Sequence, residues 1–148
     1  MKKKLAIAGS AVVAVVLLSG FAFRGGHGPC PNPERIKQVV TWKLDDKLED
    51  LDATDAQRES IHAVKDRLFT EGVQLAQEQH ATRSEVVTQL ESDTPDAQAL
   101  HALVDARIEA LRAFAHKATD AVLEVHGTLT PEQRKTLASE YKERMGLE

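Results

Sequence analysis

The hydrophobic positions of the chain recur at helical spacing from residue 33 onward. Residues 55–91 and residues 95–126 each carry apolar side chains three or four positions apart, a spacing that places them on one face of an α-helix. Only residues 92–94 separate the two segments, so the two helices are expected to fold back as an antiparallel hairpin. The apolar positions expected at the seam are Ile61, Val64, Leu68, Leu75, Val86 and Leu90 on the first helix, and Leu100, Val104, Ile108, Leu111, Ala115, Ala118, Val122 and Val125 on the second.

Two shorter helices are predicted on either side of this hairpin, at about residues 33–49 and from residue 131 onward. Each predicted helix begins at a side chain that can cap backbone N–H groups, and has an acidic residue in or next to its first turn. The four starts are Asn32-Pro33-Glu34, Thr54-Asp55, Thr94-Pro95-Asp96 and Thr130-Pro131-Glu132. Gly127 and Gly146 are expected just past helix ends, where glycine adopts the left-handed conformation. The predicted fold is therefore all-α, with four helices dominated by one long antiparallel hairpin.

One short motif stands near both ends of this helical region. Residues 129–134 are Leu-Thr-Pro-Glu-Gln-Arg, and residues 53–58 are the imperfect copy Ala-Thr-Asp-Ala-Gln-Arg. In each copy the threonine hydroxyl can accept a backbone N–H, and the glutamine three residues later can reach back to the threonine N–H, which makes a capping box. The pairs are Thr54 with Gln57 and Thr130 with Gln133, and the copies differ where Ala53 replaces the leucine found at Leu129.

The N-terminus has the pattern of an export signal. Lys2, Lys3 and Lys4 form a basic segment, and residues 5–23 contain no charged side chain. Small residues at Gly20 and Ala22 allow cleavage before residue 23, whereas the length of the uncharged run also suits a retained membrane anchor. Both alternatives predict an exported chain made of residues 1–22 as signal peptide or anchor, residues 23–32 as a flexible leader and residues 33–148 as the helical domain.

Charge and motifs exclude several classes of function. The formal net charge of the chain is −4, and it falls to −7 once the three lysines of the N-terminal segment are removed, which makes nucleic acid a poor partner. The chain contains no G-x-S-x-G turn, no Gly-rich phosphate loop after a strand and no H-E-x-x-H motif. We therefore expect a protein that is not an enzyme.

Two L-T-x-x-Q-type boxes in a small helical chain behind an export signal resemble the CpxP/Spy family of periplasmic stress chaperones. Metal-responsive relatives of that family include ZraP and CnrX. The resemblance implies a thin, curved helical homodimer in the periplasm that binds unfolding envelope proteins without ATP. It also implies that an envelope sensor kinase is a candidate partner.

Mixed basic and apolar side chains could hold such client proteins, because neither kind of contact requires fixed geometry. The family resemblance points to the first helix and to the start of the second. The candidate client-binding residues there are Arg35, Lys37, Val39, Val40, Trp42, Lys43, Lys47, Arg58, Lys65 and Phe69. The alternative for each apolar member is burial in the domain, with the basic members serving only solubility.

A long two-helix hairpin has little interior of its own. The two shorter helices can cover only part of it, and residues 77–85 in the middle of the hairpin are markedly polar. Such a chain is more stable when two copies cover each other's open sides, so we expect a homodimer.

Metal binding is the second functional hypothesis. His27 and Cys30 stand close together in the leader and offer ligands that zinc or another divalent ion can use, although two ligands are too few for a tight site. Cys30 could instead bridge two chains, because a single cysteine cannot form an internal disulfide. The hairpin would also bring His62 and Asp66 near His126, which makes a helical His/Asp cluster conceivable. No cofactor is required by the chaperone hypothesis.

Overall fold

The computed structural model describes residues 32–146, and over these residues the chain is entirely helical apart from short connections. The helices are α2 (Pro33–Asp50), α3 (Asp55–Glu91), α4 (Ala97–Thr128) and α5 (Pro131–Met145). The prediction of an all-α fold with four helices is confirmed for this part of the chain. The proposed export segment at residues 1–22 and the leader residues 23–31 lie outside the described residues.

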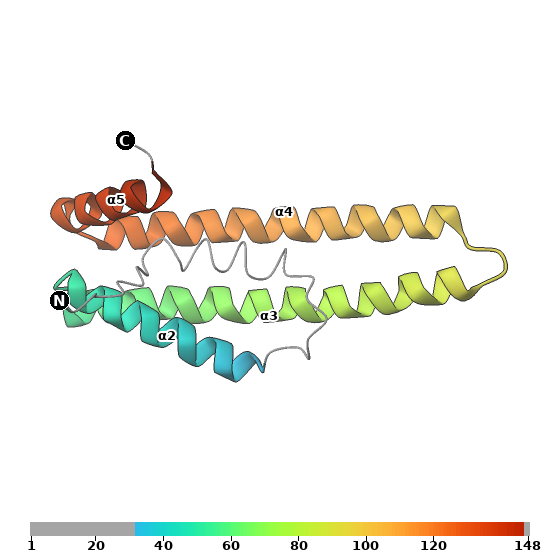
Figure 1. The fold of residues 1–148 in the computed structure, drawn as a ribbon, viewed down its shortest axis with the longest axis horizontal. Helices are drawn as coiled ribbons and strands as arrows, with labels where there is room; N and C mark the ends of the chain where they lie inside the picture. The colour runs from blue at the N-terminus through green and yellow to red at the C-terminus, as the bar shows by residue number, and fades with distance from the viewer. Residues whose placement is uncertain (1–31, 147–148) are drawn as a thin grey trace, which may run out of the picture.

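Helices α3 and α4 form the long antiparallel hairpin and give the domain its elongated shape (Figure 1). At 1.5 Å per residue, the 37 residues of α3 span about 55 Å and the 32 residues of α4 about 48 Å. Helix α2 runs beside α3, and α5 lies beside α4, both at the end away from the hairpin turn (Figure 1). We call this four-helix end the base of the domain and the opposite end, around the turn, the tip.

Two helix boundaries differ from the sequence prediction. Helix α4 is capped by Asp96 rather than Thr94, because the Asp96 carboxylate accepts the backbone N–H groups of Gln98 at 2.9 Å and Ala99 at 3.1 Å. At the other end Gly127 stays inside α4, and the helix continues to Thr128. The chain leaves the helix at Leu129, whose side chain is buried, so burial rather than the glycine sets this boundary.

Gly146 is the cap of α5, as the sequence predicts, and has a φ of +63°. That left-handed conformation favours glycine, and the backbone N–H of Gly146 closes the last turn of the helix.

The hydrophobic core lies in the base half of the domain. One cluster joins the two long helices, and a second joins α2 and α3 to the segment before α5. No residue from 76 to 113 is buried, so the tip half of the hairpin has no core of its own. The first cluster is Val64, Leu68, Leu75, Phe114, Ala118 and Ala121, and the second is Leu44, Leu48, Ala53, Ile61 and Leu129.

The apolar stripe predicted for α4 is confirmed at Ala118, which is buried, and is wrong at most of the other positions. The inward face carries Phe114, Ala118 and Ala121, with five of the predicted seam positions exposed instead. The ring of Phe114 takes the inside position and packs over Gly72 on α3. The exposed seam positions are Val104, Ile108, Leu111, Ala115 and Val122, and on α3 the predicted seam residue Leu90 is also exposed.

Across residues 32–146, none of the helices combines the length and the apolar character that crossing a membrane requires.

We predict that Gly72→Ala stabilises the domain even though Gly72 is buried. An added Cβ would lie 3.6 Å from Phe114 Cζ, an ordinary van der Waals contact, while alanine is the better helix former. The free energy of unfolding should rise by about 0.5–1 kcal/mol in urea denaturation. Gly127→Ala is the matched control, since it makes the same change in a helix with nothing within 4 Å. A lower urea midpoint for Gly72→Ala, but not for Gly127→Ala, would mean that the Phe114 ring cannot adjust to the added methyl group.

Candidate functional site

Each of the two Thr-x-x-Gln segments begins a helix. Thr54 Oγ1 accepts the backbone N–H of Gln57 at 3.3 Å, and Gln57 Oε1 accepts the backbone N–H of Thr54 at 3.0 Å. Thr130 and Gln133 make the same reciprocal pair at 3.2 and 2.9 Å. Each box therefore satisfies two backbone N–H groups that a helix start leaves without partners.

The two glutamines also bind each other across the base. Gln57 Nε2 donates to Gln133 Oε1 at 2.9 Å, and Gln133 Nε2 donates back to Gln57 Oε1 at 3.2 Å. The remaining amide protons go to backbone carbonyls, from Gln57 to Thr128 O at 2.9 Å and from Gln133 to Leu51 O at 3.0 Å. We call this exchange the amide clasp. It joins the start of α3 to the start of α5, and both side-chain amides use all their donors.

The residue before each box supports the clasp from the core side. Ala53 and Leu129 occupy equivalent places in the two copies, and both are buried in the same hydrophobic cluster with Leu48 and Ile61. The alanine of the first copy is thus accommodated in the core, next to Leu51, which is buried as well.

Beside the clasp lies a cavity of about 470 Å³ that is partly open to solvent. We call it the base cavity. All four described helices line it, and its wall is aliphatic except for five polar side chains, none of which is acidic. The aliphatic wall is Leu44, Leu48, Leu51, Ile61, Val64, Leu68, Ala121, Val122, Val125, Leu129, Leu137 and Ala138, and the polar residues are Lys47, Lys65, His126, Arg134 and Tyr141.

Lys47 and Lys65 are buried, and both are held by partners. Lys47 Nζ donates to Glu140 Oε1 at 2.6 Å, which ties α2 to α5, and lies 3.5 Å from Asp50 Oδ2. Lys65 Nζ donates to Thr41 Oγ1 at 2.9 Å, which ties α3 to α2. Burying an ammonium group is costly without such partners, so these contacts explain how two lysines fit into the base.

Asp66 lies beside two of the basic residues. Its Oδ1 is 3.3 Å from both Lys37 Nζ and Lys65 Nζ. Partial burial alone would raise the pKa of the Asp66 carboxyl, but the hydrogen bonds and charges of Lys65 and Lys37 outweigh it and lower the pKa below its usual value. Asp66 is thus a counter-ion for the lysines between α2 and α3.

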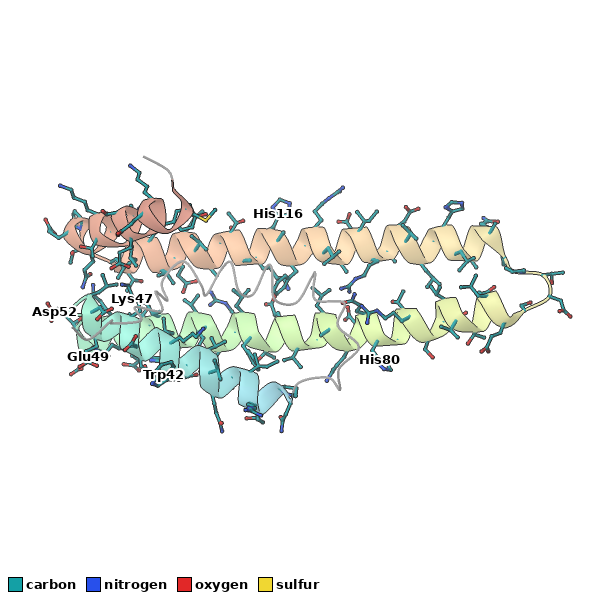
Figure 2. All side chains as sticks on the ribbon, in the orientation of Figure 1. Trp42, Lys47, Glu49, Asp52, His80 and His116 are labelled. Carbon is teal, nitrogen blue, oxygen red and sulfur yellow. The ribbon has the colours of Figure 1, made fainter. Side chains whose placement is uncertain are left out.

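The candidate client-binding residues divide into buried and exposed sets. Four of them are buried, so the prediction that they contact clients is wrong for this domain. These four are Val40, Lys47, Lys65 and Phe69. On α2, Trp42 is 66% exposed (Figure 2). Val39 is 47% exposed, and Arg35 is also exposed. Lys37, Lys43 and Arg58 are half-buried. Lys37 pairs with Asp66, and Arg58 Nε donates to Ala53 O at 3.1 Å.

The candidate metal ligands are not brought together by the fold. His62 Nε2 lies 2.8 Å from Asp45 Oδ1, Asp66 faces the lysines, and the exposed His126 lines the base cavity. Over residues 32–146, no three His, Cys, Asp or Glu side chains are grouped so that they could hold a metal ion. The conceived cluster of His62, Asp66 and His126 is therefore not formed.

The remaining histidines and the leader ligands do not change this result. Figure 2 shows His116 on the outer side of α4 and His80 on the outer side of α3, well apart from each other. His27 and Cys30 lie outside the described residues. The donor set that the structure describes does not fit a resident metal ion.

Comparison with known proteins identifies the family. A family model described as heavy-metal resistance matches residues 5–136, most of the chain. The chain belongs to the heavy-metal resistance family. This family contains CpxP/Spy-like proteins and ZraP- and CnrX-like proteins, which agrees with the sequence resemblance at the level of the family. Searches of curated proteins and of solved structures found no match.

The sequence motif predicts the two helix caps but not the hydrogen bonds between them. The motif places each glutamine at its own helix start, where only the side-chain oxygen is needed for the cap. The sequence does hold one signal for these bonds. The side-chain amide nitrogen of each glutamine needs two acceptors that its own cap does not supply. The antiparallel hairpin brings the two capping boxes to the same end of the domain, where each can supply acceptors to the other.

We predict that Gln133→Leu lowers the free energy of unfolding by about 2–4 kcal/mol in urea denaturation. The change removes one capping interaction and leaves the amide of Gln57 and the carbonyl of Leu51 without their partners. The double variant with Gln57→Leu should cost less than the sum of the single changes, because the second change removes a group already orphaned.

Gln77→Leu is the control for Gln133→Leu, because Gln77 is exposed on α3. Its effect should stay within about 0.5 kcal/mol. Equal losses for the two variants, or strict additivity in the double variant, would mean that the clasp contributes no specific stability.

Proposed function

We propose that this heavy-metal resistance protein is an exported, ATP-independent holder of unfolding envelope proteins that works as a homodimer in the periplasm. The supporting observation is that large apolar side chains remain exposed along the outside of the elongated domain. Contiguous exposed apolar surface on a soluble protein commonly marks a contact with another protein. The absence of a phosphate-binding motif from the sequence supports release of clients without ATP.

The outer stripe of α4 is proposed as the contact between two copies. Val104, Ile108, Leu111 and Ala115 are exposed, and they follow the alternating four- and three-residue spacing of a coiled-coil seam. The tip half of the hairpin has no core, so a second copy would supply the burial that it lacks. Sedimentation that finds a stable monomer at micromolar concentration would contradict this part of the proposal.

The outer face of α2 is proposed as the client surface. Val39 and Trp42 are exposed there, with the basic side chains of Arg35 and Lys43 on the same helix. An exposed indole beside flexible basic side chains can hold many unfolded sequences weakly, through apolar and charged contacts together.

Trp42 is the only tryptophan of the chain, so its fluorescence tests this surface directly. With a reduced, alkylated client that contains no tryptophan, the emission of Trp42 should shift to shorter wavelength as the indole leaves water. The full chain should suppress client aggregation near equimolar ratio, with and without EDTA, and Trp42→Ser should weaken this suppression several-fold.

Met145→Ser is the matched control, because Met145 is an exposed apolar residue at the far end of α5. It should leave the suppression unchanged. An unshifted Trp42 emission together with full activity of Trp42→Ser would contradict α2 as the client surface, and loss of suppression in EDTA would contradict a metal-independent holder.

The family match favours metal binding as the second candidate function. Its ligands would come from His27 and Cys30, joined by groups of a second chain, since the described residues offer no ligand cluster. This alternative is a zinc-binding or zinc-responsive protein of ZraP or CnrX type. Under this alternative, the divalent ion is bound by the leader and not by the helical domain.

Calorimetric titration of the full chain with zinc tests the alternative. Uptake at micromolar affinity that falls at least about tenfold in both His27→Ala and Cys30→Ser would support it. His116→Ala is the control, because His116 lies exposed on the outer side of α4 (Figure 2). Equal losses in all three variants, or no uptake, would contradict a leader site.

A further inference from the structure

We propose that the base cavity binds a long-chain carboxylate, a free ligand of the fatty-acid class. This site is separate from the proposed client surface, since it lies between the helices rather than on the outer face of α2. It does not depend on the client-holding proposal.

The walls of the cavity suit an alkyl chain. They are built from aliphatic side chains of all four described helices, and the volume of about 470 Å³ falls within the roughly 300–1,000 Å³ of small-ligand pockets. Many wall residues belong to the buried clusters of the base, including Leu48, Ile61 and Leu68. The cavity is thus a groove between the helices whose floor is formed by core residues and whose rim is open to solvent.

The polar side chains of the cavity favour an anionic head group. The five are Lys47, Lys65, Arg134, His126 and Tyr141, and no acidic side chain lines the cavity. Glu140 and Asp66 balance the charges of Lys47 and Lys65, so among the described residues Arg134 is the lining cation without a carboxylate partner. Charge complementarity therefore selects a carboxylate over a neutral or cationic amphiphile.

Arg134 is the residue best suited to hold that head group. Lys47 and Lys65 already pair with Glu140 and Asp66, whereas the Arg134 guanidinium is half-buried and forms no hydrogen bond or ion pair within the described part of the chain. It follows Gln133 directly, so the amide clasp fixes its backbone at the cavity wall. A guanidinium can bind a carboxylate through two parallel hydrogen bonds.

The position of the cavity between four helices also argues against two other occupants. An unfolded client would present side chains of both charges along one segment. A second copy is proposed to approach along the outer stripe of α4. Neither would place a single negative charge next to Arg134 with an apolar chain behind it. A fatty acid carries both features in one molecule.

Calorimetric titration of the full chain with palmitate, below its micellar concentration, tests the site. We expect saturable binding of one palmitate per chain and much weaker binding of octanoate, which leaves most of the wall uncovered. Arg134→Glu should lower the affinity for palmitate at least about tenfold, since it removes a charge-assisted contact and adds repulsion. The affinity of the same variant for hexadecanol, which has the same alkyl chain without the charge, should stay within about twofold of the unsubstituted protein's.

Two further variants separate the head group from the cavity. Lys135→Glu makes the same charge change at the next residue, which is exposed and does not line the cavity, and it should leave palmitate affinity within about twofold. Ala138→Trp fills the cavity from an exposed position on α5, so it should weaken palmitate and hexadecanol alike. Circular dichroism of each variant checks that the helices are intact.

The proposal is overturned if palmitate does not saturate, or if Arg134→Glu and Lys135→Glu weaken it equally. It is also overturned if Ala138→Trp leaves binding unchanged while the variant is folded. Binding of the full chain to phosphatidylglycerol vesicles without binding of palmitate would assign the surface to a membrane and would reject a free carboxylate. Failure of these tests leaves the client assay with Trp42 unaffected, so the two proposals can fail separately.

Discussion

The exchange of hydrogen bonds between Gln57 and Gln133 is the constraint on which the base of the domain depends. A hairpin of two long helices does not fix the position of the chain that precedes or follows it. The clasp does so, because each glutamine satisfies its own helix start and then binds the segment that leads into the other. Helices α2 and α5 are thereby held at one end of the hairpin. The base cavity exists only because both helices are held there.

One ion pair and one hydrogen bond reinforce the same arrangement at two further points. Lys47 joins α2 to α5 through Glu140, and Lys65 joins α3 to α2 through Thr41. Both lysines are buried at the edge of an apolar core, where an unpaired ammonium would be unfavourable. The basic residues that seemed suited to clients from sequence alone are thus partly structural. Fewer basic side chains are exposed on α2 and α3 than the sequence suggested.

The sequence predicted the fold well because its signals are local. Capping boxes, the prolines at helix starts and the three-residue connection between the long helices each act over a few residues, and α3 begins and ends where the pattern predicts. The facing of α4 was not predictable in the same way. Two apolar stripes run along that helix, and the choice between them depends on Phe114 finding the space above Gly72 on another helix. Such complementarity between distant residues has no periodicity of its own.

The candidate sites were also hard to predict wherever they depend on contacts between helices. Exposure of Trp42 and burial of Lys65 depend on which face of α2 meets α3, and the sequence around α2 allows either. His62 was expected near His126, but it pairs with Asp45 from α2, a helix whose path the hairpin pattern does not define. The base cavity could not be predicted at all, because it is a gap left among four helices.

The absence of buried residues between positions 76 and 113 has a consequence for how the domain can vary. That outer half of the hairpin relies on hydrogen bonds within single helices, such as Gln74 to Glu78, and on bridges such as Arg107 to Gln79. Insertion or deletion of matching heptads in both arms would preserve their facing and leave the base untouched. The length of the outer half of the hairpin could therefore change without refolding the base.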